Sequence, residues 1–324
     1  LQRRPCQDSQ HLIKEGYKDM NFQFMKNRYT FFGLSITLVV ISILLLMVKG
    51  LNYGIDFKGG SILHVRFVDE SSESKIRDNF KQIAKERNLY FTADQIVVQS
   101  VAGGQNREFI IQYPAAPMDS AENAEIHDHI LGDLKRLAPF SDEALEVSNV
   151  GPTIGDDLKK QGLQAAVLSV VGILLYLAYR FEFQSAIGAI IALVHDLIIV
   201  LGAISLIGLE FDVTVLAAAL TLLGYSVNDS IVILDRIREN RKITKETSFA
   251  AVIDASINQT LGRTLNTSIT TLLALFSLLI LGGISIKGFA TTLTIGCIIG
   301  TYSSIFIASP VLFEMTGDKL GRSK

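Results

Sequence analysis

The sequence has little of what an enzyme or a cofactor protein usually needs for its chemistry. Among its 324 residues are only two cysteines, Cys6 and Cys297. Cys6 lies in a charged terminal tail and Cys297 in a long apolar run, so a disulfide between them is not expected. The sequence shows no glycine-rich phosphate loop, no cluster of metal ligands and no nucleophile beside a base. We therefore expect no enzymatic activity and no cofactor, and any energy must come from a gradient or a partner.

An excess of charge is also missing. The chain has 30 Lys and Arg against 32 Asp and Glu, a formal net charge of −2, and no dense basic cluster. Nucleic-acid binding relies on concentrated positive charge, so we do not expect a nucleic-acid partner.

Long apolar runs, in contrast, dominate the sequence. Hydrophobic residues make up 49% of the chain, and the mean hydropathy is +0.36. A helix of about 20 residues crosses a hydrocarbon core of about 30 Å. Six runs reach or approach that length, at 30–48, 162–179, 184–209, 213–234, 264–286 and 288–312. The pattern predicts a polytopic α-helical membrane protein with six transmembrane helices.

The distribution of Lys and Arg predicts the orientation of these spans. Positive charge gathers before the first run, in "RIRENRKITKE" after the fourth, and in the last residues of the chain. Such segments favour the cytoplasmic side, which places both termini there. We predict cytoplasmic tails at 1–29 and 313–324, a first transmembrane helix at 30–48, an external domain at 49–161, and the other five helices within 162–312.

Two features near the start of the chain bear on its processing. The first apolar run is longer than a usual signal-peptide core and has no cleavage pattern after it, so we interpret it as a retained anchor. The chain begins with Leu, and residues 1–19 are interpreted as a fusion remnant or a misplaced start, with Met20 as a candidate initiator.

The predicted external segment alternates strand and helix patterns. Its order is strand, helix, two strands, helix and strand, at 61–68, 72–88, 95–101, 107–114, 119–137 and 143–150. This is the order of a ferredoxin-like α+β domain. His127 and His129 suggest a metal, but residues two apart on a helix point in different directions. A solvated helix face is therefore the favoured interpretation for this pair.

Asp229 interrupts the fourth run, in "YSVNDS", on a stripe with Thr221 and Tyr225. An ionised group at mid-span costs about 2.5–3.5 kcal/mol, so we expect it to face protein or water rather than lipid. Arg263, just before the fifth apolar run on a helix that we expect to begin at about Ser256, is the expected partner, at a matching depth. Two roles remain open from the residues alone, a proton-binding site and an ion pair that holds helices together.

Other polar and small residues mark two more spans. His195 and Asp196 lie in the middle of the third run, and either extend a proton path or are satisfied by hydrogen bonds to neighbouring helices. In the sixth run Gly296, Gly300 and Ser304 recur every four residues, a spacing suited to close helix packing.

Short glycine motifs flank the external domain. "GIDFKGG" at its entrance contains Gly54, Asp56, Gly59 and Gly60, and "VGPTIGDDL" at its exit begins around Gly151 and Pro152. Taken alone, these motifs are typical of tight bends where an anchor helix meets a domain. With "YSVNDSIVILDRIREN" and "ALVHD" in the same order and spacing, the chain resembles the SecF family of the bacterial Sec protein-export machinery from about Met25 to Met315.

The resemblance implies one half of a resistance-nodulation-division fold, in the bacterial inner membrane, that uses the proton-motive force to help exported proteins finish crossing. It implies SecD as the other half, SecYEG as the associated channel, unfolded exported polypeptide as the substrate, and YajC and YidC as further candidate partners. It assigns the proton-relay role to Asp229 and Arg263, and we add His195, Asp196 and Asn228 as candidates. Two alternatives are a small-molecule efflux half of the same superfamily and a scaffold without transport activity.

Overall fold

The computed structural model describes residues 22–87, 95–100, 107–114, 120–140, 146–150, 152–243 and 248–317. The chain divides into two compact units. One comprises Leu1–Leu51, Val167–Leu209 and Ala217–Lys324, and the other comprises Asn52–Ala166 and Glu210–Leu216. Residues 210–216, between the third and fourth spans and at the start of the fourth, therefore belong to the same unit as the predicted external segment.

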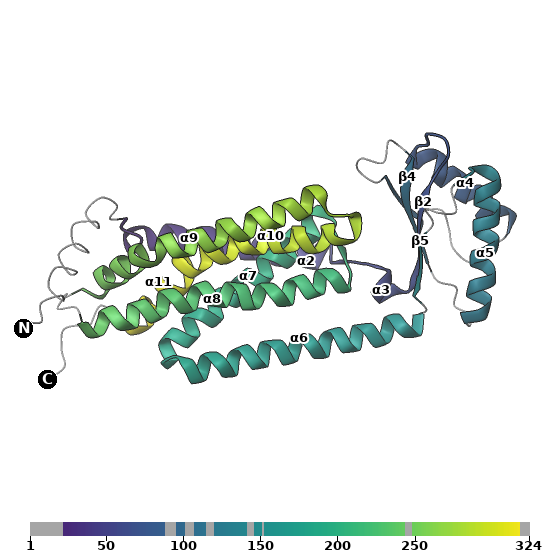
Figure 1. The fold of residues 1–324 in the computed structure, drawn as a ribbon. Helices are drawn as coiled ribbons and strands as arrows, with labels where there is room; N and C mark the ends of the chain where they lie inside the picture. The colour runs from purple at the N-terminus through teal and green to yellow at the C-terminus, as the bar shows by residue number, and fades with distance from the viewer. Residues whose placement is uncertain are drawn as a thin grey trace, which may run out of the picture. The chain divides into compact units, whose positions relative to one another are not determined.

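Long helices form the first unit and continue into the second (Figure 1). In the described part of the chain, six are long and apolar enough to cross a membrane. A short turn, η1 (Met25–Asn27), precedes the first of them. The helices are α2 (Arg28–Val48), α6 (Pro152–Arg180), α7 (Phe183–Ile207), α8 (Val213–Ile243), α9 (Phe249–Leu281) and α10 (Ile284–Ser303), which continues through η4 (Ser304–Ala308) into α11 (Ser309–Thr316). The predicted membrane fold class is confirmed.

Helix α7 shows how the sequence ends a span. Gly208 has a φ of 71°, the left-handed conformation that glycine adopts without steric cost. The Gly208 N–H donates to the Ser205 carbonyl at 3.3 Å, and the Leu209 N–H donates to the Ile204 carbonyl at 3.2 Å. These bonds satisfy carbonyls that a helix end otherwise leaves open. The chain then turns within a few residues into α8.

The segment η4 is a π-helix, a single wider turn within the last span. Four of its five residues are buried, so it is packed inside the bundle. Such turns are rare and occur often at functional sites. No feature of the residue pattern indicated it, because the apolar and small residues continue through it without interruption.

The second unit contains a four-stranded antiparallel sheet with strand order β3-β4-β2-β5. Along the chain, β2 (Gly60–Arg66) is followed by α4 (Glu73–Glu86), β3 (Val97–Ser100), β4 (Glu108–Tyr113), α5 (Ser120–Leu137) and β5 (Glu146–Val150). Figure 1 shows α4 and α5 on the same side of the sheet. This order and this arrangement are those of the ferredoxin-like fold that the sequence predicts.

Periodicity explains the core of this unit. Leu63, Val65 and Phe67 alternate along β2 and its extension and are buried, as a strand with one covered face requires. The Ile76, Phe80 and Ile83 side chains of α4 cover that face. At the start of α4 the Ser72 side chain accepts a hydrogen bond from the Lys75 N–H, a typical N-cap.

An ion pair joins the two helices of this unit. Arg87, which follows α4, donates from Nε to Asp133 Oδ2 of α5 at 2.7 Å. The hydrogen bond from the Arg87 guanidinium holds the pKa of the Asp133 carboxyl below its ordinary value of 3.8. The pair therefore stabilises the folded unit above that ordinary value, and the stabilisation disappears as the pH falls through the lower folded-state pKa.

Asp133→Asn is expected to lower the unfolding temperature of an isolated 50–160 fragment by about 2–4 °C at pH 7, since a partly exposed pair contributes little. The difference from the unchanged fragment should shrink below pH 3.8. Thermal denaturation followed by circular dichroism across pH checks this. A difference that stays constant down to pH 2 would contradict the assigned ion pair.

Candidate functional site

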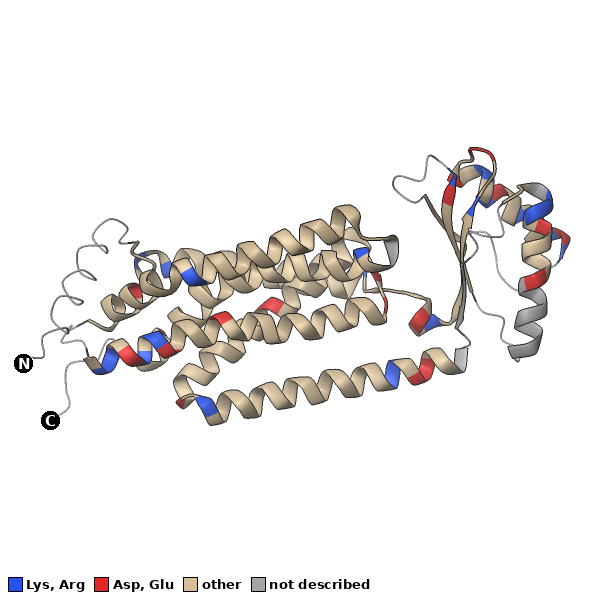
Figure 2. Cartoon of the chain, in the orientation of Figure 1, with Lys and Arg blue, Asp and Glu red and all other residues tan. Residues whose placement is uncertain are grey.

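Asp229 lies in α8 and is 3% exposed. Its Oδ2 atom has no hydrogen-bond partner, and no ion pair with Asp229 is found in the part of the chain that the structure describes. Figure 2 shows isolated acidic positions within an otherwise almost uncharged bundle. An unpaired carboxylate in a membrane span is costly, so a proton, a cation or water has to compensate for its charge.

Arg263 does not form the expected ion pair. It lies on α9 and attracts Asp229 only at longer range. The buried stripe of α9 contains Thr260, Thr264 and Ser268, whereas Arg263 is exposed on the neighbouring flank of the helix. Because one residue turns an α-helix by about 100°, Arg263 does not share the face of α9 that packs inside this chain.

Asp196 of α7 is the centre of a hydrogen-bond cluster. It is 1% exposed, and its Oδ2 accepts hydrogen bonds from the hydroxyls of Ser226 and Ser303, at 2.5 Å and 2.6 Å. Its Oδ1 lies 2.9 Å from Nδ1 of His195. Ser226 belongs to α8 and Ser303 to α10, so one carboxyl connects three helices. We call this group the Asp196 cluster.

The Asp196 cluster approaches both Asp229 and the π-helix along the chain. Ser226 precedes Asp229 by three residues on α8, which places the two side chains on neighbouring positions of one helix face. Ser303 is the last residue of α10 before η4. A change in the protonation of Asp196 or of Asp229 would therefore affect the same turn of α8, the one that contains Ser226.

His195 extends the cluster toward α2. Its ring stacks on that of Tyr302 with centroids 6.3 Å apart. The Tyr302 hydroxyl is 2.9 Å from the Ser35 hydroxyl and donates to the Phe31 carbonyl at 3.1 Å. Nε2 of His195 is buried without a hydrogen-bond partner. The imidazole therefore has one nitrogen on the Asp196 carboxyl and one available for a further donor or acceptor.

A second polar group lies between α8, α9 and α10. The Ser268 hydroxyl is 2.6 Å from that of Thr301, and the Tyr225 hydroxyl donates to Ser268 Oγ at 3.5 Å. Cys297 Sγ lies 3.3 Å from the Tyr225 hydroxyl. The hydroxyl residues of these two groups that were not identified from the sequence are Ser226, Ser303, Tyr302, Ser268 and Thr301. Hydroxyl side chains in apolar helices usually bond their own backbone, so their positions alone give no signal.

The predicted small-residue ridge of the sixth span lies against α8. A Cβ at Gly296 would be 2.4 Å from Leu222 Cδ1, and one at Gly300 would be 3.2 Å from Ser226 Cβ. Ser304 is fully buried and donates to the Thr301 carbonyl at 3.0 Å. The absence of side chains at the two glycines allows α10 to pack closely against α8.

Both glycine motifs lie at the start of structural elements in the second unit. Gly54 precedes the short helix α3 (Ile55–Lys58), which contains Asp56, and Gly59 and Gly60 follow it. Pro152 begins α6, and Gly151 lies outside the described residues. None of these residues takes part in the two polar groups of the bundle.

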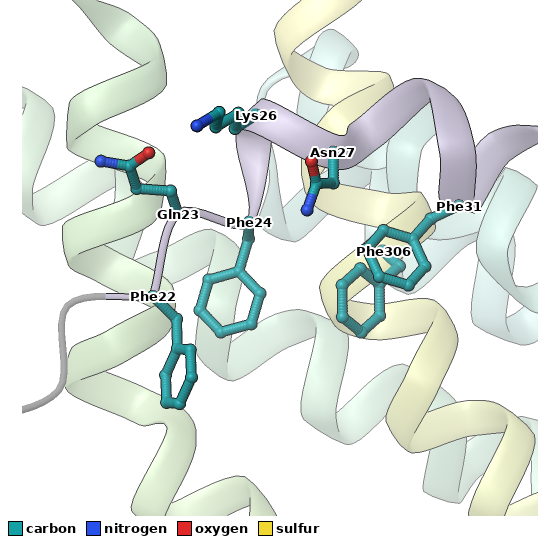
Figure 3. A pocket seen from close by; sticks show the side chains of 7 residues that line it. All are labelled: Phe22, Gln23, Phe24, Lys26, Asn27, Phe31 and Phe306. Atoms are coloured by element: carbon teal, nitrogen blue, oxygen red, sulfur yellow. The ribbon is translucent and has the colours of Figure 1, made fainter.

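A groove of about 460 Å³ lies at the start of α2 (Figure 3). Four aromatic rings line it, those of Phe22, Phe24, Phe31 and Phe306, together with Gln23, Lys26 and Asn27. It contains none of the predicted relay residues. In the described ranges, no group of three or more His, Cys, Asp or Glu side chains could hold a metal ion.

Comparison with known proteins places these features in a family. Residues 131–318 match the family model described as protein export membrane protein SecD/SecF, C-terminal. Residues 44–69 match the model described as the SecD/SecF GG motif. This range contains Asp56 and the glycine pair Gly59 and Gly60.

Individual relatives cover nearly the whole chain. Protein translocase subunit SecF of Petrotoga mobilis is 39% identical over 298 residues, which are 91% of this chain and 96% of the relative. The SecF subunit of Vibrio alginolyticus is 40% identical over 292 residues, 90% of this chain and 89% of the relative.

A solved structure shares the fold. The crystal structure of SecDF, a translocon-associated membrane protein from Thermus thermophilus, superposes with a TM-score of 0.77 at 35% identity. The match covers 92% of this chain and 39% of the SecDF chain, so the chain spans well under half of that protein. On all of these grounds the chain belongs to the SecF family of protein translocase subunits.

Proposed function

We propose that the chain pairs with SecD and uses the proton-motive force to assist protein translocation at a late, extracytoplasmic stage. The main support for proton coupling is the environment of Asp229. This carboxyl lies in a membrane helix, is 3% exposed, and has no hydrogen-bond partner for Oδ2. A helix-holding role alone would favour a fully bonded side chain, because a buried polar group left unbonded is destabilising.

The arrangement of Arg263 supports a role that changes during a cycle. Arg263 is exposed on α9 and attracts Asp229 without an ion pair. When Asp229 loses its proton, the carboxylate gains an attraction to this guanidinium, and when it is protonated the attraction is lost. One proton can therefore shift the balance between two arrangements of α8 and α9. His195 and Asp196 are proposed as a branch of the same path, through Ser226.

Partnership with SecD is supported by an exposed face of α8. Ala217, Thr221, Gly224 and Asn228 recur at steps of three and four residues and are exposed in the single chain. Small residues at this spacing are typical of helix contacts within membranes, and an exposed Asn side chain is poorly accommodated by lipid. We propose that SecD covers this face, with Asn228 and Arg263 near the contact.

The distribution of positive charge and the fold support a proposal for the orientation of the chain in the membrane. Both termini are proposed to be cytoplasmic, in the bacterial inner membrane, with the ferredoxin-like unit outside, where it contacts exported polypeptide. The last turn of α8 contains Arg241 and Lys242, which favours the cytoplasmic side for this end of the helix. SecYEG, YajC and YidC are proposed as further members of the assembly.

Co-expression with SecD is expected to yield a complex that survives mild detergent and restores export in cells depleted of both subunits. Gly224→Leu should reduce both the recovered complex and export by about tenfold, since overfilling a packed contact costs about 1–3 kcal/mol. Gly172→Leu on α6 is the matched control, because both glycines have nothing within 4 Å of an added Cβ. Full activity of the chain without SecD, or equal effects of the two variants, would contradict the partnership.

A further inference from the structure

The GG motif region lies against the loop between α7 and α8 and takes no part in the polar groups of the bundle. Strand β1 (Asn52–Tyr53) pairs in parallel with β6 (Glu210–Phe211), although 158 residues separate the paired positions Asn52 and Glu210 in the chain. The Gly54 N–H adds a hydrogen bond to the Phe211 carbonyl at 3.0 Å. All of these residues belong to one compact unit.

Asp56 binds the first turn of α8. Its Oδ2 accepts a hydrogen bond from the Val213 N–H at 3.0 Å. The local residue Asp212 already caps this helix, since its Oδ1 accepts from the Val215 N–H and the Thr214 hydroxyl, both at 2.7 Å. Two carboxylates thus share the positive end of α8. The carboxylate of Asp56 comes from the GG motif, which is far from α8 in the sequence. Its hydrogen bond therefore attaches the GG motif to the start of α8.

The same segment is fixed on its other side to the sheet. Gly60 begins β2 with a φ of 158°, and a Cβ there would lie 2.8 Å from the Tyr113 carbonyl oxygen of β4. Only glycine allows this close approach to the neighbouring strand. Gln112 of β4 donates from Nε2 to Glu210 Oε2 of β6 at 2.9 Å, which ties the sheet to the loop a second time.

Aromatic rings fill the space between these attachments. The ring of Phe57 stacks on that of Phe211 with centroids 5.9 Å apart, and Tyr53 meets both rings edge to face. Phe57 is 3% exposed. Three rings from two segments therefore pack as one cluster, which adds to the free energy needed to separate the two segments.

A tight bend between an anchor helix and a domain explains the glycines but not these attachments. A bend needs neither a carboxylate on the first N–H of a helix far along the chain nor a two-strand pairing with the loop before it. Both attachments converge on the start of α8, which is one continuous helix from Val213 to Ile243 and includes Asp229. The motif thus joins the sheet to the helix on which the coupling carboxyl lies.

We infer that Asn52–Gly60 is a rigid connection through which α8 moves the external α+β unit, and that Asp56 is the positioning residue that attaches this connection to α8. The inference rests on the proposed function, since it assigns the route by which protonation of Asp229 reaches the external domain. Movement of α8 along or about its axis would displace Val213, and the bond to Asp56 together with the β1–β6 pairing would transmit that displacement to β2.

The first test uses Asp56→Ala in the assembled complex with SecD. Gradient-dependent export per complex should fall about tenfold, because the bond to α8 is removed, whereas the amount of complex should stay unchanged. Asp56→Asn retains an acceptor oxygen and should recover most of the rate. Asp156→Ala, which removes an exposed carboxylate of α6 paired with Lys159, is the matched control and should have no effect. An unchanged rate in Asp56→Ala would overturn the assignment.

A cross-link separates a rigid connection from a simple cap. Asn52→Cys with Glu210→Cys, in a chain whose Cys6 and Cys297 are replaced by Ala, places two cysteines at paired positions of β1 and β6. Oxidation should leave gradient-dependent export within about twofold of the reduced protein, and should restore it when Asp56→Ala is also present.

Two outcomes of this experiment would overturn the rigid connection. Loss of export on oxidation would mean that the two strands separate during the cycle, and failure to rescue Asp56→Ala would mean that Asp56 acts otherwise than by attachment. The cysteine-free parent distinguishes a third case. If that parent exports without any response to a gradient, the proposed function itself fails, and the coupling role fails with it.

Discussion

Asp229→Asn should leave the amount of complex with SecD unchanged and abolish the stimulation of export by a proton gradient. Asn has nearly the shape of Asp and retains hydrogen-bonding capacity, but it cannot ionise. Because the Asp229 side chain is buried and Oδ2 has no partner, the substitution breaks no hydrogen bond of Oδ2 that assembly could depend on. We therefore expect the variant to export at nearly the same rate with and without a gradient.

The size of the effect follows from the energy in the gradient. One charge moved through 100 mV is worth about 2.3 kcal/mol, which shifts a two-state equilibrium about fifty-fold. A cycle driven by repeated protonation of one carboxyl loses all of this when the carboxyl is removed. A partial loss would indicate a second group that carries protons independently of Asp229.

Arg263→Met tests whether the attraction between the Arg263 guanidinium and the Asp229 carboxylate is needed for proton coupling. It removes the guanidinium that attracts the Asp229 carboxylate and keeps a long apolar stem. We expect normal assembly and loss of the gradient response, since the deprotonated state loses its stabilisation. Ion pairing that only holds helices together predicts the opposite pattern, in which Asp229→Asn is tolerated and Arg263→Met reduces the amount of complex.

Asp196→Ala should reduce the amount of folded protein at least tenfold. The substitution leaves the Ser226 hydroxyl and His195 Nδ1 without their buried partner, while the Ser303 hydroxyl keeps only the Gly300 carbonyl of its own helix. Each unsatisfied polar group costs about 1–3 kcal/mol, and the lost bonds connect α7, α8 and α10. Quantification of membrane-inserted, detergent-stable protein checks this. Ser277→Ala is a suitable control, because that hydroxyl bonds only the Leu273 carbonyl of its own helix.

Asp196→Asn distinguishes the two roles that the sequence left open for this residue. The Asn oxygen still accepts from the serine hydroxyls, so the variant should assemble. We propose Asp196 as a branch of the proton path and not as its obligatory site, so we expect the variant to keep most of its gradient response. A variant that assembles fully but does not respond to the gradient would instead place Asp196 in the obligatory proton path.

Much of the fold is contained in patterns that depend on neighbouring residues in the chain. Uninterrupted apolar runs predict the six spans, and alternation at Leu63, Val65 and Phe67 predicts the covered face of β2. Burial of Asp229 was also predictable, because a lone carboxylate in such a run has no favourable place in lipid. These inferences need only periodicity and the cost of transferring charge.

The features that the residue pattern did not indicate depend on tertiary geometry. The exposed position of Arg263 differs by one residue from the buried position of Thr264, and stripe patterns do not resolve that difference when Thr and Ala occupy both faces. The Asp196 cluster combines hydroxyls from three helices, and the β1–β6 pairing involves two residues on each side. Neither leaves a pattern in the sequence, since each contact is made by a few residues that are far apart in the chain.

We propose that the proton gradient drives export through the carboxyl of Asp229. The most direct test is the ratio of export rates with and without an imposed proton gradient, normalised to assembled complex and measured in the same membranes for the unchanged chain and for Asp229→Asn. We expect a ratio well above one for the unchanged complex, and a ratio near one for the variant at equal rates without a gradient. Equal ratios for the two complexes would contradict this role of Asp229.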